Sequence, residues 1–427
     1  MTHADADFNA EPHGPDATDR QLADQYEAYP YPRRDPREEA KRLIVGSPSH
    51  LREIDYWVFG ATRPASRPLN ALIAGGGTGD ATVMLATHLT RLGRPGSVTW
   101  VDRSSASLRL AQERAKVRGL TNIVWEQRSL LDLPGSGLGP FDYIDCCGVL
   151  HHLPDPAEGL RALLSVLAPG GGLGLMVYAP HGRTGVYMIQ DALRMLAPPD
   201  EPPQRRLDVA RRVMRHLPDT QWLRHNRNFD DHINGGDAGL YDLLLNPRDR
   251  AYTVTALDAL LRDAGLEVAC WVEPLRYDPT PLLPDPKLRA LLTDMTVTQR
   301  AALAEALAGN ISAHIVYCIR ANEPRRRAGP FAPDTVPVIR EWTVDDFVRA
   351  TGPDGTLVIN IDGLRLPVAL PPLGLGILRL VDGNRTVGQI AATMAERGVK
   401  PGAFDKAWRQ TFTALERINR LLLAAPP

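Results

Sequence analysis

The chain has 427 residues, a length that suggests two or three domains and permits a full-sized hydrophobic core. Its formal net charge of -1 gives no electrostatic reason to expect a nucleic acid or an anionic membrane as a partner. No apolar run is long enough to span a bilayer, the polar N-terminus does not resemble a signal peptide, and the four cysteines lack metal-ligand spacing. We therefore expect a cytoplasmic protein with reduced cysteines, no membrane partner and no metal.

The first 60 residues are predicted to form two parts. Residues 1–20 are polar and predicted to be disordered. Residues 21–60 form an arm that begins with Tyr26, Tyr29 and Tyr31 among prolines, and the prolines predict an extended backbone there. A helix at His50–Phe59 then leads into the core.

A glycine-rich turn between two apolar strands is the most informative segment. Gly75, Gly77 and Gly79 follow the first strand, and the second strand ends in Asp102, about 20 residues later. Glycines let backbone approach a ligand, the following helix start presents free N–H groups, and the acid can accept hydrogen bonds from both hydroxyls of a ribose. The dinucleotide register fails because Asp80 stands at its last glycine position, and the Gly-Lys-Ser/Thr of a phosphate loop is missing. The turn therefore fits a nucleoside without a pyrophosphate.

Two further motifs follow in order along the chain. Phe141–Asp145 leads into Gly148–Pro156, and Leu167–Gly172 precedes an apolar strand that ends at Tyr178. With the glycine turn, they resemble class I S-adenosylmethionine-dependent methyltransferases over residues 69–179. The resemblance implies S-adenosyl-L-methionine as the cofactor. It also implies an α/β fold with a Rossmann-like, doubly wound sheet of seven strands in the order 3-2-1-4-5-7-6.

The resemblance also implies which residues hold the cofactor. The glycines would pass beneath its methionine part and ribose, Asp102 would bind the ribose, and Ser129 or Asp132 would contact the adenine. One departure is Ile73, which stands where many relatives carry an acid that helps to hold the cofactor's amino group; Asp80 or loop carbonyls could replace that acid. The cofactor-binding residues predicted in this way are Gly75, Gly77, Gly79, Asp80, Asp102, Arg103, Ser129, Leu130, Gly148 and Val149.

Methyl transfer requires an acceptor atom held in line with the activated methyl, often beside a base. His152 follows the fourth strand, where acceptor and methyl would meet, and is either the base or, as the resemblance implies for such a histidine, a structural or substrate-orienting residue. His232 is a second candidate because neighbouring acids raise the basicity of an imidazole, although a polar surface loop is the alternative. Tyr29 is a third candidate, from an arm that either closes over the site as a lid or simply packs on the core.

The remaining chain is predicted to extend the methyltransferase domain and to add a second one. Residues 61–322 form the methyltransferase domain, with a helical insertion at 181–250 whose last part is polar. Residues 323–337 are predicted to form a linker, and its arginines are predicted to lie in a solvated hinge. Residues 338–427 form a small α+β domain, similar to a winged helix, with a hairpin around Asp362-Gly363.

Three functions remain open at this stage. The first is methylation of a small molecule in a lidded pocket. The second is methylation of a peptide or protein that docks on the C-terminal domain, and the third is a non-catalytic binding protein with this fold. The same C-terminal domain could instead form a homodimer. The accepting atom is not predicted.

Overall fold

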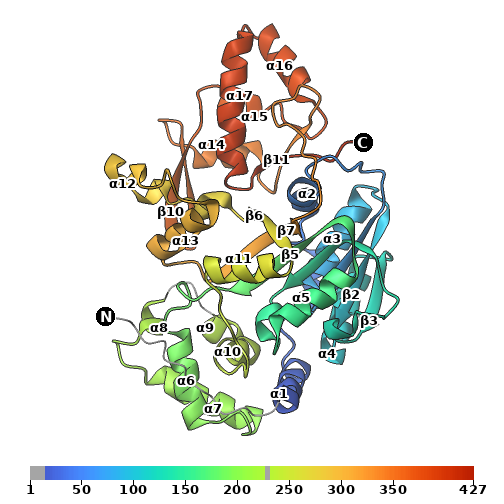
Figure 1. Ribbon diagram of the computed structural model, residues 1–427, viewed down its shortest axis with the longest axis vertical. Helices are drawn as coiled ribbons and strands as arrows, with labels where there is room; N and C mark the ends of the chain where they lie inside the picture. The colour runs from blue at the N-terminus through green and yellow to red at the C-terminus, as the bar shows by residue number, and fades with distance from the viewer. Residues whose placement is uncertain (1–14, 227–230) are drawn as a thin grey trace.

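The computed structural model describes residues 15–226 and 231–427 and has a seven-stranded sheet at its centre (Figure 1). The strands are β1 (Leu69–Ala74), β2 (Gly96–Asp102), β3 (Ile123–Gln127), β4 (Phe141–Cys147), β5 (Leu167–Tyr178), β6 (Leu266–Trp271) and β7 (Ala313–Arg320). Their order is β3-β2-β1-β4-β5-β7-β6, and β7 runs antiparallel to both of its neighbours. The predicted α/β class and strand order are confirmed.

Helices cover both faces of the sheet, so its strands are apolar on both sides. Ala71 and Ile73 of β1 belong to the core that contains residues of α3, whereas Leu72 and Ala74 belong to the core that contains residues of α5 and α11. This alternation follows from the two-residue repeat of a strand. The helices here are α3 (Asp80–Arg91), α4 (Ser105–Val117), α5 (Pro156–Ser165), α11 (Val254–Asp263), α12 (Pro286–Ala290) and α13 (Val297–Ala308), with short turns η3 (Leu130–Asp132), η4 (Leu150–His152), η5 (Pro274–Tyr277) and η6 (Thr280–Leu282).

The N-terminal segment differs from its prediction. Residues 15–28 form helix α1 (Pro15–Ala28), where a disordered tail and then an extended arm were expected. Pro15 stands in the first turn, where proline is tolerated, and the next proline, Pro30, lies beyond the helix end, so nothing in between interrupts the helix. Residues 1–14 lie outside the described part. The arm continues through η1 (Pro36–Ala40) to the helix predicted at 50–59, which is built from α2 (Leu51–Glu53) and a π-helical turn, η2 (Ile54–Val58).

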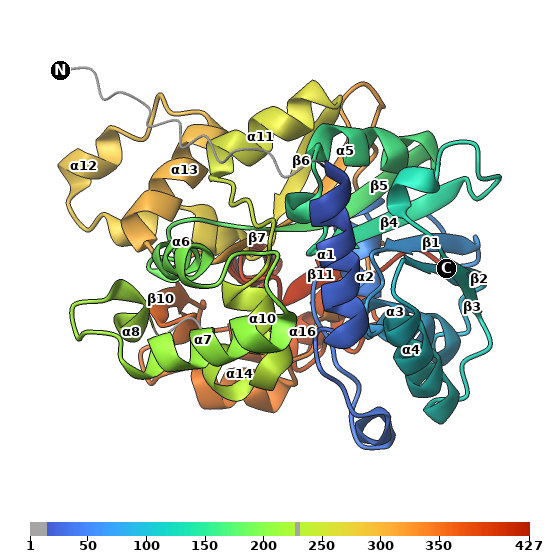
Figure 2. The same cartoon turned by 90° about the horizontal axis from the view of Figure 1, so that it is seen from below.

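The insertion after β5 is helical, as predicted, and has a small core of its own. It contains α6 (Val186–Leu196), α7 (Pro203–Arg215), α8 (Trp222–His225), α9 (Asp231–Asn234) and α10 (Gly236–Leu244). Helix α10 occupies the stretch predicted to be merely polar, and its residues Leu240, Leu243 and Leu244 are buried in that core. Figures 1 and 2 show α1 on the same side of the molecule as the insertion.

The C-terminal region forms short strands and four helices at the opposite end of the molecule (Figure 1). Its elements are β8 (Pro337–Ile339), α14 (Val344–Ala350), β9 (Thr356–Ile361), β10 (Leu364–Ala369), α15 (Gly374–Leu378), α16 (Val387–Glu396), α17 (Pro401–Glu416) and β11 (Leu421–Leu423). The predicted hairpin is confirmed, since β9 and β10 pair around Asp362 and Gly363, both with positive φ. The winged-helix assignment stays a prediction.

The C-terminal region shares its core with η2 and with one face of the sheet. The Trp57 indole N–H donates to Asn419 at 3.0 Å, and the Asn419 amide donates to Glu53 at 2.7 Å. The arginines before it are not the solvated hinge that was predicted: Arg325 donates to the Trp57 carbonyl, and Arg327 pairs with Glu416 of α17 at 2.7 Å. These contacts fasten the connecting segment to both regions.

Among the described residues, none of the helices combines the length and the apolarity required to cross a bilayer. The four cysteines are free thiols; Cys146, Cys270 and Cys318 are buried and Cys147 is half-buried.

Candidate active site

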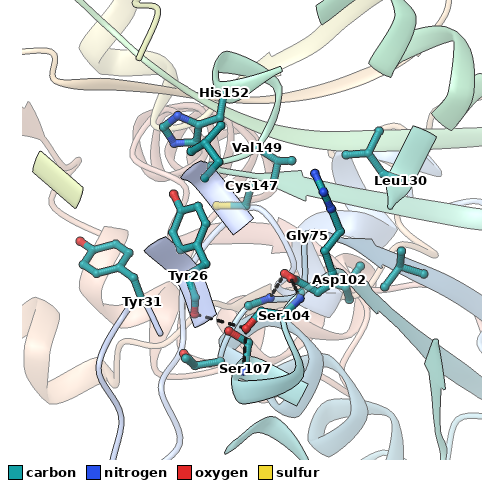
Figure 3. A pocket seen from close by; sticks show the side chains of 18 of the residues that line it. Tyr26, Tyr31, Gly75, Asp102, Ser104, Ser107, Leu130, Cys147, Val149 and His152 are labelled. Atoms are coloured by element: carbon teal, nitrogen blue, oxygen red, sulfur yellow. Dashed lines mark hydrogen bonds between the residues drawn. The ribbon is translucent and has the colours of Figure 1, made fainter. Parts of the chain in front are cut away.

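A cavity of about 670 Å³ opens at the carboxyl ends of β1, β2 and β4 (Figure 3). Its size lies within the range of about 300–1,000 Å³ usual for small-molecule and cofactor sites. This edge of a parallel sheet is where α/β folds bind ligands. All the predicted cofactor residues line the cavity: Gly75, Gly77, Gly79, Asp80, Asp102, Arg103, Ser129, Leu130, Gly148 and Val149.

The glycine turn after β1 has no room for side chains. Gly75, Gly77 and Gly79 have φ values of +78°, +45° and +98°. A Cβ on Gly75 would lie 2.2 Å from a methyl group of Val149, and a Cβ on Gly76 would lie 2.1 Å from the Trp100 ring. The turn therefore presents bare backbone to the cavity, as a ligand that lies against it requires.

Asp102, the last residue of β2, is held by backbone N–H groups on both oxygens. Gly77 donates to Oδ2 at 2.8 Å and Ser104 donates to Oδ1 at 3.0 Å (Figure 3). Burial raises the pKa of this carboxyl, and the two N–H donors oppose that rise. Because a carboxylate has about four lone-pair sites, Asp102 can still accept hydrogen bonds from two ribose hydroxyls.

Asp80 lines the same cavity but is already matched by two cations. Arg34 of the arm donates to it through Nη2 at 2.6 Å, and Arg114 of α4 donates through Nη1 at 2.6 Å. Burial opposes ionisation, yet the two guanidinium groups hold the pKa of Asp80 below its ordinary value. The arrangement ties the arm to the start of α3.

Ser129 begins the short turn η3 beside the cavity. Its Oγ accepts the N–H of Leu131 at 3.2 Å, while the Asp132 carboxylate accepts the N–H of Ser129 at 3.2 Å. This reciprocal cap occupies Asp132, which is not among the residues that line the cavity. Of the two alternatives for the adenine contact, Ser129 is the one that faces the ligand space.

A second group of polar residues lines the other end of the cavity. Tyr26 of α1 donates its hydroxyl to Asp242 of α10 at 3.0 Å, and Tyr178 at the end of β5 donates to the same carboxyl at 3.3 Å. Burial, together with the nearby Asp242, raises the pKa of Tyr26, and burial also raises the pKa of Asp242. The rings of His152 and Tyr178 have centroids 5.9 Å apart, and Nδ1 of His152 is 2.6 Å from the carbonyl oxygen of Arg248.

Of the two predicted catalytic residues whose side chains the structure describes, His152 lines the cavity and Tyr29 does not. Tyr29 lies just beyond the end of α1 and stacks on Tyr241 in the insertion, with ring centroids 5.4 Å apart. Tyr26, one helical turn earlier, takes the place at the cavity that was expected for Tyr29. His232 lies within α9, and its side chain is outside the described part of the structure.

Sequence reasoning missed three residues of the site. Asp145 lies in the buried part of β4 between Ile144 and Cys146, and an acid at such a position was the available signal. Tyr178 ends β5 at the edge of the sheet where the other strands contribute residues. Asp242 gave no signal because α10 itself was not predicted. Among the residues the structure describes, no cluster of three or more His, Cys, Asp or Glu could hold a metal ion.

A family model described as a methyltransferase domain matches residues 72–173. An uncharacterized protein from Synechococcus sp. is 31% identical over 305 residues, which cover 69% of this chain and 70% of that protein. A ubiquinone biosynthesis O-methyltransferase from Albidiferax ferrireducens is 36% identical over 88 residues, 21% of this chain and 34% of that enzyme.

The fold is similar to that of PKMT2 from Rickettsia typhi, with a TM-score of 0.62 and 16% identity over 88% of this chain and 75% of that one. The structure of PKMT2 in complex with AdoHcy gives a TM-score of 0.61 at 17% identity and covers 89% of this chain and 76% of that one. At these identities the likeness is one of fold.

Proposed function

The chain belongs to the class I S-adenosylmethionine-dependent methyltransferases, and we propose that it methylates a small-molecule acceptor enclosed between its glycine turn and helix α1. The observation that carries this proposal is the make-up of the cavity. Its lining comes from α1 and the arm, from β1, β2, β4 and β5 near their carboxyl ends, from the segments that follow β1, β2, β3 and β4, and from Asp242 of α10, and none of it comes from residues 323–427. The described C-terminal region lies at the far end of the molecule from α1 and α10 (Figure 1).

The cofactor fits the end of the cavity at the glycine turn. Three glycines with positive φ leave backbone free beside it, and Asp102 offers acceptors for its ribose hydroxyls. When bound, S-adenosylmethionine supplies an activated methyl group on a sulfonium. Gly148 and Val149 follow β4 and line the cavity; Val149 lies against Gly75, and His152 ends the next turn, η4, so the methyl would face the acceptor here.

His152 is the proposed base. The carbonyl of Arg248 can only accept a hydrogen bond, so Nδ1 of His152 carries the proton that it donates at 2.6 Å. In a neutral ring this leaves Nε2 with a free lone pair. His152 is 8% exposed and lines the cavity, so that lone pair can take the proton of an acceptor hydroxyl or amine as its methyl bond forms.

The experiment is a transfer assay with S-adenosylmethionine labelled in its methyl group. The full-length protein is offered a pool of small hydroxyl and amine compounds, and separately a pool of peptides and folded proteins. We expect label to enter the small-molecule pool and AdoHcy to accumulate in step. Label found only in the peptide or protein pool would overturn the proposal. Removal of residues 331–427 is not a suitable test, because that region shares a core with η2 and the sheet.

A further inference from the structure

The departure at Ile73 raises the question of what holds the amino group of the cofactor. Ile73 is buried in β1, where many relatives carry an acid. In the sheet, Ile73 lies directly opposite Asp145 of β4. Paired residues on neighbouring parallel strands project from the same face, and the strands lie about 4.8 Å apart. Asp145 is therefore an acid on the strand next to Ile73, on the same face of the sheet as the position where the usual acid is missing.

Asp145 is a buried carboxyl that faces the cavity. It is 1% exposed and is among the residues that line the cavity. The Ser49 hydroxyl donates to its Oδ2 at 2.6 Å, and the Cys147 N–H donates to its Oδ1 at 3.1 Å. Each oxygen keeps a lone pair, and burial raises the pKa of Asp145 to about 7, against the effect of these two donors.

Asp145 differs in its partners from Asp80 and Asp102, the two other acids near the glycine turn. Asp80 is bonded to Arg34 and Arg114. Asp102 stands at the end of β2, where the ribose hydroxyls are expected. No ion pair of Asp145 is found among the described residues, and a buried carboxylate without a cation is costly. A cation inside the cavity would remove that cost.

We propose that Asp145 binds the α-ammonium group of the cofactor's methionine part and so replaces the acid that β1 lacks. The proposal rests on the chain's use of S-adenosylmethionine and names the residue that recognises one group of it. Ser49 would then be a positioning residue, because its hydroxyl fixes the carboxylate and joins the segment before α2 to the floor of the site.

The test compares two ligands that differ in the amino-acid part. AdoHcy carries the ammonium group, whereas 5′-methylthioadenosine keeps the nucleoside and the sulfur but lacks the amino acid. Calorimetric titration of full-length wild type and Asp145→Asn would measure the affinity for each. We expect Asp145→Asn to weaken AdoHcy about 10- to 100-fold, as for a lost charge-assisted hydrogen bond, and to leave 5′-methylthioadenosine within about twofold.

Asp142→Asn is the matched control, because Asp142 is on the same strand, pairs with Arg63 at 2.8 Å and does not line the cavity. It should leave both affinities unchanged. If Asp145→Asn weakens both ligands equally, Asp145 has a structural role and the proposal fails; if it weakens neither, Asp145 does not touch the ligand. A wild-type protein that binds neither ligand would instead refute the cofactor site itself.

A second ligand pair guards against misfolding of the variant. AdoHcy and its deamino analogue are titrated into wild type and Asp145→Ser. The four affinities form a thermodynamic cycle that measures the interaction between the carboxyl and the ammonium group. Loss of the amino group should cost about 10- to 100-fold in wild type and little in the variant. If loss of the amino group lowers affinity equally in wild type and variant, the assignment is wrong. If neither variant folds, the wild type alone decides, and equal affinity for AdoHcy and the deamino analogue would overturn the assignment.

Discussion

The two ends of the cavity are built in different ways. The end that fits the cofactor comes mostly from one stretch of chain, from β1 to the loop after β4, which the arm joins through Arg34 on Asp80. Much of it is backbone: a bare glycine turn and N–H groups that hold Asp102. The opposite end comes from segments far apart in the sequence, and it consists of side chains: Tyr26 of α1, His152, Tyr178 and Asp242 of α10. One end recognises a ligand with the fold itself, and the other with residues that the arm and the insertion bring to it.

This difference implies that the two ends can be disabled separately. Changes near the glycine turn should lower affinity for S-adenosylmethionine, and changes around Asp242 should act on the acceptor. A substitution that moved both affinities together would show that the ends are coupled through the arm, which touches Asp80 at one end and Asp242 at the other.

The largest effect is expected for Asp102→Ala. The variant loses the proposed acceptors for both ribose hydroxyls and the carboxylate that fixes the N–H groups of Gly77 and Ser104. With hydrogen bonds to a charged group worth about 1.5–3 kcal/mol each, affinity for S-adenosylmethionine should fall at least about 100-fold. Calorimetry measures this directly. Asp102→Asn, which keeps one oxygen, should lose less, and unchanged binding in Asp102→Ala would remove the residue from the cofactor end.

The next largest effect is expected for one of two glycines that have similar positive φ values but different surroundings. Gly75 and Gly93 have φ of +78° and +60°, so alanine is strained at both by about 1–2 kcal/mol. A Cβ on Gly75 meets Val149 at 2.2 Å, whereas a Cβ on Gly93 meets nothing within 4 Å. Both variants should melt at lower temperature, but only Gly75→Ala should lose affinity for S-adenosylmethionine, by about tenfold or more. Equal binding by the two variants would mean that the turn does not lie against the ligand.

The same contrast explains how much could be predicted. Glycines that require positive φ, and an acid at the end of the next strand, are local features, so the sequence predicts the α/β fold and residues that do line the cavity at the glycine turn. The strand order came from the resemblance to the methyltransferase family. The acceptor end depends on tertiary packing. Whether Tyr26 or Tyr29 faces the cavity depends on where α1 ends. Asp242 is placed by α10, a helix that begins at Gly236 and is held by Leu240, Leu243 and Leu244. No local pattern shows either.

Tyr26→Phe should have a moderate effect that is confined to the acceptor end. It removes the hydroxyl that donates to Asp242 at 3.0 Å and leaves that buried carboxyl with the weaker bond from Tyr178. Loss of about 1 kcal/mol corresponds to an increase of about fivefold in the KM for the acceptor, with the affinity for S-adenosylmethionine unchanged. Tyr29→Phe is the matched control, since its ring stacks on Tyr241 outside the cavity. Steady-state kinetics with an acceptor from the transfer assay would measure both, and an equal change in both variants would contradict the placement of Tyr26.

The smallest effect concerns the charge of Asp145 in the ligand-free protein. Its pKa is raised to about 7 in the folded state, whereas an exposed Asp titrates near about 4. Between these values the folded protein holds a proton that the unfolded chain has lost, so the contribution of Asp145 to the free energy of unfolding falls as pH rises and levels off above about pH 7. Asparagine does not titrate.

The melting temperature of Asp145→Asn relative to wild type should therefore rise by about 2–4 °C from pH 5 to pH 7.5, as differential scanning calorimetry can measure. Asp142→Asn, which breaks the pair with Arg63, should show no such rise. Saturating AdoHcy should reverse the difference in melting temperature between variant and wild type at pH 7.5. An ammonium group beside Asp145 stabilises the ionised carboxyl of the wild type, whereas the asparagine of the variant carries no charge. If AdoHcy instead stabilises the two proteins equally, the cofactor end recognises its ligand through the nucleoside alone, and the acid opposite Ile73 serves only to hold Ser49.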